Sequence, residues 1–217
     1  MASEQDPHRA MPVMTGGAPL RQARLALVLL HGRGSSPEDM LGLASELSCE
    51  DCAYLAPQAA GSIWYPYPFM APLAQNQPWL ASALKKIETI LAQLEAEGFP
   101  AQKVALLGFS QGASLLLEFT ARHPRRYGAV FGLSGGLIGP PGTAWEADSS
   151  LAGTPIFLGC SDRDPFIPRQ RVDESAAVLQ RLGGQVTERI YPNLGHTVIP
   201  DEIDFIRDTL SQLNAAG

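Results

Sequence analysis

The sequence predicts an α/β fold in one domain, with a mostly parallel, doubly wound sheet and helices on both faces. Residues 25–30 (LALVLL) and 104–107 (VALL) are unbroken apolar runs, typical of parallel strands buried on both faces. Segments with helical spacing of apolar residues, such as 79–97, alternate with these runs, as they do in βαβ units. A chain of 217 residues is long enough for one large domain with a substantial core.

The elements follow in order after an N-terminal segment that mixes charged residues with proline and glycine. We expect this segment, residues 1–20, to be a flexible arm, and residues 21–217 to form the domain. Strands are expected at residues 25–30, 53–56, 104–107, 129–133, 155–159 and 186–191. Helices are expected at residues 37–47, 79–97, 168–182 and 201–213, and between Ser110 and His123.

Composition argues against membrane insertion and against nucleic acid as a partner. The first 20 residues hold no continuous apolar stretch, so the sequence predicts neither a signal peptide nor a membrane span. We therefore expect a cytoplasmic protein without stable insertion into a membrane. The net charge of -6 argues against nucleic acid as a partner, because phosphate groups bind basic patches.

The chain has three cysteines, Cys49, Cys52 and Cys160, which we expect to be thiols. Cys49 and Cys52 have C-x-x-C spacing, but neither a second pair nor a nearby histidine completes a zinc site. The setting is also unlike that of a thioredoxin-type redox motif. We expect a helix-to-strand loop at residues 49–52, and no metal.

Residues 58–78 form a long proline-rich stretch with many aromatic side chains. Its four prolines exclude a regular helix, and its aromatic residues are too apolar for a solvated linker. Long loops of this kind are usually functional, but aromatic side chains can also simply cover the end of a sheet. Both interpretations stay open, and Trp64, Tyr65, Phe69 and Met70 are candidates for the wall of an acyl pocket.

The residues from Gly108 to Gly112 read GFSQG and match the pattern G-x-S-x-G. In that pattern a serine sits on a sharp strand-to-helix turn, where its hydroxyl is exposed at the top of the sheet. The flanking glycines avoid side-chain collisions where the chain folds back. The alternative is an ordinary turn with Ser110 as a helix cap, since serine is also favoured there.

A serine hydroxyl needs a nearby base to act as a nucleophile, and the chain offers four histidines. His8 lies in the expected arm, and His123 lies at the far end of the helix that follows Ser110. His31 follows a strand, but it sits within a glycine-rich turn, where we expect its ring to support the loop. His196 follows the strand at 186–191 and comes after the serine, so it is the predicted base.

The acid that orients this base is expected in the loop after residues 155–159, which contains two aspartates. Asp162 and Asp164 both fit by spacing. Pro165 fixes the backbone after Asp164, whereas Asp162 can satisfy the amides of its own turn. We therefore favour Asp164 by a small margin.

Two backbone amides are candidates for an oxyanion hole. The N–H of Gln111 lies at the start of the helix after the serine, where amides are unpaired and the dipole favours an anion. The second candidate is the N–H of Arg33, in the glycine-rich loop after residues 25–30. The guanidinium of Arg33 could attract an anionic group of the substrate or pair with an acidic neighbour.

Four segments resemble one known family. Residues 30–34 (LHGRG), 108–112 (GFSQG), 162–168 (DRDPFIP) and 195–196 (GH) are similar to the phospholipase/carboxylesterase family of α/β-hydrolases, which includes the acyl-protein thioesterases. The stretch from Ala56 to Trp79 is more like the bacterial carboxylesterase branch. The resemblance implies an α/β-hydrolase fold without metal or organic cofactor, and frequently a homodimer. It also implies a triad of Ser110, Asp164 and His196, with Arg33 and Gln111 in the oxyanion hole.

The predicted function is that of a serine carboxylesterase acting on small-molecule esters with short to medium acyl chains. A lysophospholipase or an acyl-protein thioesterase would use the same residues on a different substrate. Dienelactone hydrolases resemble this fold but use a cysteine nucleophile, and Ser110 argues against that activity. The alternative from another class is a binding protein built on an inactive hydrolase scaffold.

Overall fold

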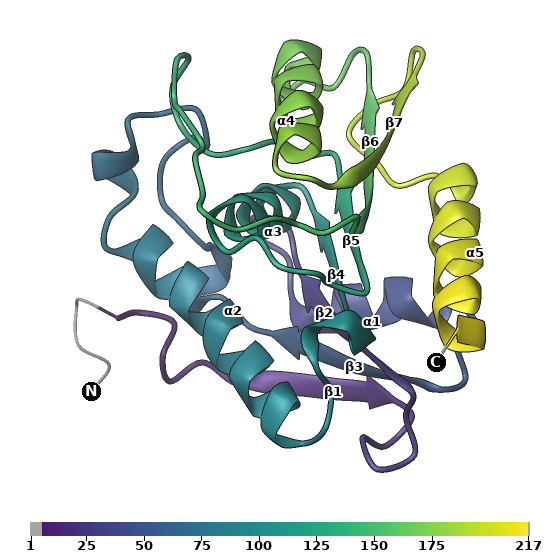
Figure 1. Cartoon of the computed structure of the whole chain (residues 1–217). Helices are drawn as coiled ribbons and strands as arrows, with labels where there is room; N and C mark the ends of the chain where they lie inside the picture. The colour runs from purple at the N-terminus through teal and green to yellow at the C-terminus, as the bar shows by residue number, and fades with distance from the viewer. Residues whose placement is uncertain (1–5, 217) are drawn as a thin grey trace.

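A computed structural model describes residues 6–216 of the chain, in which a seven-stranded sheet is covered by helices (Figure 1). The strand order is β1-β3-β2-β4-β5-β6-β7, and all neighbours are parallel except the pair of β1 and β3. The strands are β1 (Val13–Gly17), β2 (Leu25–Leu30), β3 (Cys52–Pro57), β4 (Val104–Phe109), β5 (Ala129–Leu133), β6 (Pro155–Ser161) and β7 (Gln185–Tyr191). The helices are α1 (Pro37–Ser45), α2 (Trp79–Ala96), α3 (Gln111–Arg122), α4 (Arg169–Arg181) and α5 (Pro200–Ala216), with short 3-10 turns at Ala60–Ser62, Leu73–Asn76 and Ala101–Lys103.

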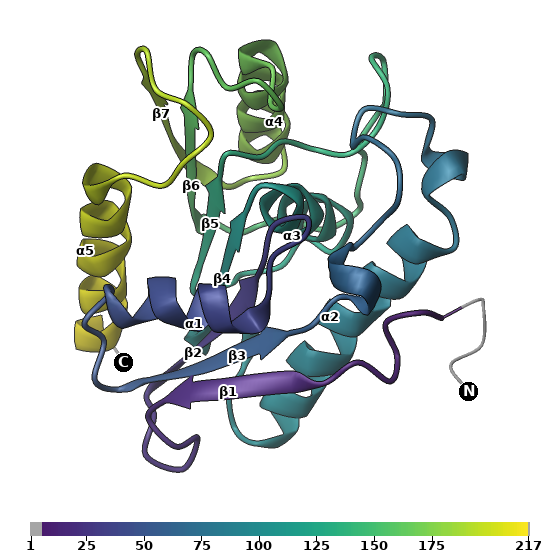
Figure 2. The ribbon, with the colours of Figure 1, turned by 180° about the vertical axis from the view of Figure 1, so that it is seen from behind.

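The helices cover both faces of the sheet, which confirms the predicted fold class. Along β2, Leu25, Leu27 and Leu29 pack on the side of α1 and α5, whereas Ala26 and Val28 pack on the side of α2, α3 and α4. Figure 2 shows α1 and α5 on the face opposite to α2 and α3. Since both faces of the strand are buried, the apolar run has no polar alternation.

The parallel register aligns the carboxyl ends of the central strands. Leu30 of β2 lies opposite Gly108 of β4, and Phe109 lies opposite Leu133 of β5. Leu133 in turn lies opposite Gly159 of β6. The loops that follow β2, β4 and β6 therefore emerge at one edge of the sheet, where groups from distant parts of the sequence can meet.

The structure differs from the predicted flexible arm over residues 6–20, while residues 1–5 of that arm lie outside the described residues. β1 pairs with β3 in antiparallel register along the edge of the sheet. His8 is fully buried; its Nε2–H donates to the Trp64 carbonyl at 3.0 Å, and its Nδ1 accepts from the Ala60 amide at 3.1 Å. Burial lowers the pKa of this histidine. The segment is ordered by these long-range contacts rather than by a helix or hydrophobic run of its own.

The cysteines are not all thiols, contrary to expectation. Cys49, in the loop after α1, and Cys52, the first residue of β3, form a disulfide; their Cα atoms lie 5.3 Å apart, a normal separation for a disulfide. Cys160 is free and buried. Within residues 6–216, no helix is long and apolar enough to cross a membrane, and no cluster of three or more metal-ligating side chains is found.

Candidate active site

Ser110 lies at the bend between β4 and α3 in a backbone conformation that few non-glycine residues adopt, with φ 56° and ψ -120°. The flanking glycines are required by close approach of the backbone. A Cβ atom on Gly108 would lie 2.7 Å from the Ala113 amide nitrogen, and one on Gly112 would lie 2.6 Å from the His31 carbonyl oxygen. This is the strained strand-to-helix turn that the G-x-S-x-G pattern predicts.

Ser110, His196 and Asp164 form a continuous chain of hydrogen bonds at the carboxyl edge of the sheet. The distance from Ser110 Oγ to His196 Nε2 is 2.7 Å, and that from His196 Nδ1 to Asp164 Oδ2 is also 2.7 Å. Because a carboxylate only accepts, Nδ1 carries the proton, and Nε2 is free to accept the proton of the serine hydroxyl. The second carboxylate oxygen of Asp164 accepts the amides of Phe166 and Ile167 at 2.9 and 3.0 Å.

The structure separates the two candidate acids. Asp164 contacts His196 and its side chain is fully buried, whereas Asp162 is exposed and accepts the Asn193 amide at 2.7 Å. Asp162 therefore ties the loop after β6 to the loop after β7. The sequence suggested that Asp162 satisfies the amides of its own turn, but the Arg163 amide of that turn donates to Ser161 Oγ at 3.1 Å instead.

The remaining histidines have structural contacts. His31 is fully buried; its Nδ1–H donates to the Gly32 carbonyl at 2.7 Å, and its Nε2 accepts the Ala59 amide at 3.1 Å. Burial lowers the pKa of His31, so the neutral ring supports the loop after β2. His123 stacks on Phe119 at the end of α3, with 4.5 Å between ring centroids.

Of the two residues predicted for the oxyanion hole, one follows Ser110 in the chain and the other follows a glycine that lies against Ser110. Gln111 is the first residue of α3, and Arg33 follows Gly32, where a Cβ atom would lie only 3.3 Å from the Ser110 Cβ. Neither amide donates a hydrogen bond to another residue within 6–216. Both side chains are turned to the neighbouring loop, since the Gln111 amide group and the Arg33 guanidinium donate to the Tyr65 carbonyl at 2.8 and 2.7 Å.

A cavity of about 560 Å³ opens at Ser110. Of the four predicted wall residues, Tyr65 and Phe69 line it, whereas Trp64 and Met70 do not. Trp64 is fully buried beneath the loop, where its Nε1–H donates to the His31 carbonyl at 2.8 Å. The other lining residues are Gly32, Arg33, Ser35, Pro66, Pro68, Phe109, Ser110, Gln111, Ser114, Phe166, Ile167 and His196.

Sequence reasoning missed Phe109, Ser114, Phe166 and Ile167 as cavity residues. Phe109 and Phe166 both contact His196, with ring centroids 4.9 and 5.0 Å apart. A signal was present, because Phe109 lies within the GFSQG motif and Phe166 follows Asp164 by two residues. Apolar residues directly beside predicted catalytic groups are natural candidates for a cavity wall.

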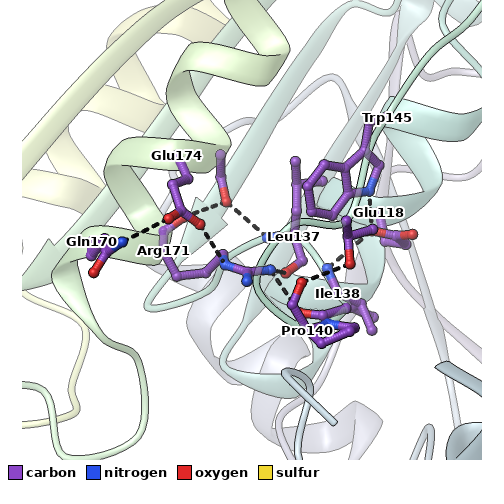
Figure 3. A network of polar contacts seen from close by, with 11 residues as sticks. Glu118, Leu137, Ile138, Pro140, Trp145, Gln170, Arg171 and Glu174 are labelled. Carbon is purple, nitrogen blue, oxygen red and sulfur yellow. Dashed lines mark hydrogen bonds and ion pairs between the residues drawn. The ribbon is translucent and has the colours of Figure 1, made fainter. Parts of the chain in front are cut away.

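The segment after β5 is fastened to α3 by a buried carboxylate. Glu118 is fully buried, and its Oε2 accepts from the Ile138 amide and from Trp145 Nε1, each at 2.9 Å (Figure 3). Its Oε1 accepts from Arg122 Nε at 2.6 Å. The three donors satisfy both oxygens of this buried side chain, as buried polar groups require.

The same segment is fastened to α4 by a buried guanidinium. Arg171 Nη1 donates to the Leu137 and Gly139 carbonyls, each at 2.9 Å, as Figure 3 shows for Leu137. The Gly139 amide then donates to the Phe69 carbonyl at 2.8 Å. The cavity wall at Phe69 is thus connected through hydrogen bonds to two helices of the core.

The loop that carries His196 is held at its far end by Glu202, in the first turn of α5. Glu202 is only 1% exposed, and its Oε2 accepts the Ile199 amide at 3.0 Å. Burial raises the pKa of this carboxyl group to about 7. As the pH rises from about 4.5 to about 7, the unfolded chain therefore loses this proton before the folded chain does.

We expect the Glu202→Gln variant to remove this pH-dependent loss of stability. In the wild type, the free energy of unfolding should be highest below about pH 4.5, the pKa of the unfolded chain. It should decrease by about 3 kcal/mol as the pH rises to about 7. Glutamine stays neutral and keeps a carbonyl acceptor for the Ile199 amide. We expect urea unfolding between pH 4.5 and 7.5 to show that the unfolding free energy of the variant increases relative to that of the wild type as the pH rises. A difference in unfolding free energy that does not change with pH contradicts the expectation.

A mostly parallel sheet, a serine at a strand-to-helix turn, and an aspartate and a histidine that follow in that order define the α/β-hydrolase class. Within that class, the chain belongs to the phospholipase/carboxylesterase family, whose model matches residues 17–214. This establishes the predicted family and the predicted kind of enzyme, a serine hydrolase of the carboxylesterase type.

The chain is also similar to solved structures and to curated proteins. The chain is similar to the phospholipase/carboxylesterase from Dyadobacter fermentans, with 40% identity, a TM-score of 0.89 and coverage of 93% of this chain and 97% of that one. The esterase PE8 has 26% identity, a TM-score of 0.79 and coverage of 94% and 99%. Acyl-protein thioesterase 1 of Saccharomyces cerevisiae is 25% identical over 225 residues, 89% of this chain and 96% of that protein.

Proposed function

We propose that this protein is a serine carboxylesterase that hydrolyses esters with short to medium acyl chains through an acyl-enzyme. The observation that supports this most strongly is the hydrogen-bonded chain from Asp164 through His196 to Ser110, which ends in the cavity. Membership of a carboxylesterase family supports ester hydrolysis as the reaction.

In the proposed first half-reaction, Ser110 Oγ attacks the ester carbonyl carbon and its proton passes to His196 Nε2. Asp164 stabilises the imidazolium that forms, through the hydrogen bond to Nδ1. The amides of Arg33 and Gln111 donate to the developing oxyanion, which typically contributes about 3 to 4 kcal/mol per donor. When the tetrahedral intermediate collapses, the ester C–O bond breaks and the alcohol leaves with the proton from His196.

The second half-reaction repeats these roles with water as the nucleophile. His196 removes a proton from the water, whose oxygen attacks the carbonyl carbon of acyl-Ser110. The bond from this carbon to Ser110 Oγ then breaks, and the serine recovers its proton from His196. The carboxylic acid is released, and the free enzyme is restored.

The size of the cavity sets the expected acyl length. About 560 Å³ is in the usual range for small-molecule sites, and the acyl and alcohol groups must share it. With 4-nitrophenyl esters from acetate to palmitate, kcat/KM should rise by up to about fourfold for each buried methylene and stop rising at a medium chain length. A steady rise up to palmitate contradicts the proposed acyl length.

The alternative is a lysophospholipase or an acyl-protein thioesterase with the same chemistry. Two observations favour it as the second candidate: the yeast relative is named acyl-protein thioesterase 1, and large aromatic side chains are exposed beside the cavity. Phe166 is 66% exposed and Tyr67 is 52% exposed. A longer acyl chain could lie against these rings, and the same chain-length series would then favour palmitate.

A further inference from the structure

The cavity at Ser110 has one permanently charged side chain, that of Arg33, among the described residues that line it. The wall is otherwise built mainly of aromatic, proline and aliphatic side chains, with few polar groups. A guanidinium stays charged at every physiological pH. The cation therefore gives the cavity a fixed electrostatic preference that an aliphatic residue at this position would not provide.

The charge of Arg33 is not neutralised by the protein within residues 6–216. Its Nη2 donates to the carbonyls of Tyr65 and Tyr67, at 2.7 and 3.4 Å, and none of the described ion pairs includes this residue. Asp39, an acidic residue near this loop, instead accepts from Ser35 Oγ at 2.6 Å and from the Ser36 amide at 3.1 Å. The structure thus removes one of the two roles that the sequence left open, pairing with an acidic neighbour.

The guanidinium is also held in place and keeps unused donors. Of its five N–H groups, the two on Nη2 are directed at backbone carbonyls, and the three on Nε and Nη1 have no partner among the described residues. Arg33 is an exposed residue, and its carbonyl contacts direct the guanidinium toward the loop that lines the cavity, which lowers the entropic cost of recognition. A fixed cation with free donors beside an apolar wall is suited to bind an anion.

We infer that the preferred substrates are esters that carry a negatively charged group, such as a carboxylate, placed to reach Arg33 while the ester carbonyl lies at Ser110. This inference rests on the proposed esterase function and specifies its substrate class. Gly32, which precedes Arg33, lies against Ser110, so the cation is close to the reacting ester. The charge could be on the acyl chain or on the alcohol, and the same donors would bind either.

Two pairs of isosteric esters test the inference. The first compares the 4-nitrophenyl monoester of adipic acid with the analogue in which the free carboxylate is a carboxamide. The second compares 4-acetoxybenzoate with 4-acetoxybenzamide, which puts the charge on the leaving alcohol. In at least one pair, the wild type should have a kcat/KM at least tenfold higher for the anionic ester, which corresponds to about 1.4 kcal/mol. The pair that shows the preference identifies the charged side of the substrate.

The Arg33→Gln variant should lower this anionic-to-neutral ratio by about tenfold, and Arg33→Lys should retain part of it. The ratio is the readout because any displacement of the Arg33 amide or of the Tyr65 carbonyl affects both esters of a pair alike. Higher salt should also reduce the wild-type ratio. Ratios near or below one in both pairs, or a ratio unchanged in Arg33→Gln, overturn the inference. Hydrolysis of the neutral esters in that case leaves the esterase proposal intact, whereas absence of hydrolysis of all four esters argues against the esterase itself.

Discussion

Replacing Ser110 with alanine is expected to lower kcat/KM for a short 4-nitrophenyl ester by roughly 10⁴-fold or more. The variant lacks the oxygen that attacks the carbonyl, while the oxyanion-hole amides and the cavity stay in place. The fold should be unaffected, because the serine hydroxyl bonds only to His196 among the described residues. Steady-state kinetics together with thermal unfolding of both proteins check this result.

Ser114 offers a matched control for this prediction. It lies one helical turn after Ser110 in α3, lines the same cavity, and its Oγ accepts the Gly136 amide at 3.3 Å. Ser114→Ala removes a hydroxyl from the same cavity but none from the proposed chemistry, so we expect less than about a tenfold loss. Near-normal turnover by Ser110→Ala, or an equal loss in both variants, contradicts the assignment of Ser110 as the nucleophile.

The Asp164→Asn variant is expected to lower kcat by about 10⁴-fold. The amides of Phe166 and Ile167 donate to Asp164 Oδ1, so the carbonyl oxygen of an asparagine would remain there. Its NH₂ group would then face His196 Nδ1 and donate to it. This favours the tautomer with the proton on Nε2, which cannot accept the proton of Ser110. Kinetics at several pH values measure the loss.

Asp162→Asn is the control for that substitution, two residues away in the same loop. The asparagine carbonyl can still accept the Asn193 amide, so the turn should be kept and kcat should stay within about threefold of the wild type. A loss in Asp162→Asn as large as that in Asp164→Asn shows that the substitutions act by disturbing the loop. A larger loss in Asp162→Asn than in Asp164→Asn shows that Asp162, and not Asp164, is the acid that orients His196.

The strands and helices were predictable where local sequence determines them. The apolar runs at β2 and β4 and the helical spacing of α2 show burial directly, and the structure has these elements at the predicted places. β1 was not predictable, because VMTGG has neither an apolar run nor regular alternation. It forms an edge strand through pairing with β3, and a sequence pattern does not contain that long-range contact.

The arrangement of Ser110 and His196 was predictable because chain order and strand ends place both groups at one edge of the sheet. The choice of Asp164 over Asp162 depended on the geometry of a turn, for which the only local signal was Pro165 directly after Asp164. The cavity wall was predictable only in part. The sequence placed Tyr65 and Phe69 in it correctly, but a proline-rich loop has no periodicity that tells which side chains face inward. Trp64 instead packs beneath the loop against His31, and Met70 is not among the residues that line the cavity.

The absence of an acidic partner for Arg33 was also beyond the sequence. Several acidic residues lie near it in the chain, including Glu38 and Asp39, and either could have paired with it. In the structure, Asp39 instead belongs to the capping box at the start of α1, with Ser36 as its partner. The Asp39 carboxylate is thus used by a helix cap and forms no ion pair with Arg33.

The most direct test of the central claim is the mass of the intact protein after treatment with a fluorophosphonate. In a working triad, Ser110 Oγ attacks phosphorus, the P–O bond forms, and fluoride leaves. We predict that the wild type gains one phosphonyl group, that peptide mapping locates it on Ser110, and that Ser110→Ala gains none. A wild-type mass that does not change, or an adduct that persists in Ser110→Ala, contradicts the account and favours an inactive hydrolase scaffold that only binds its ligand.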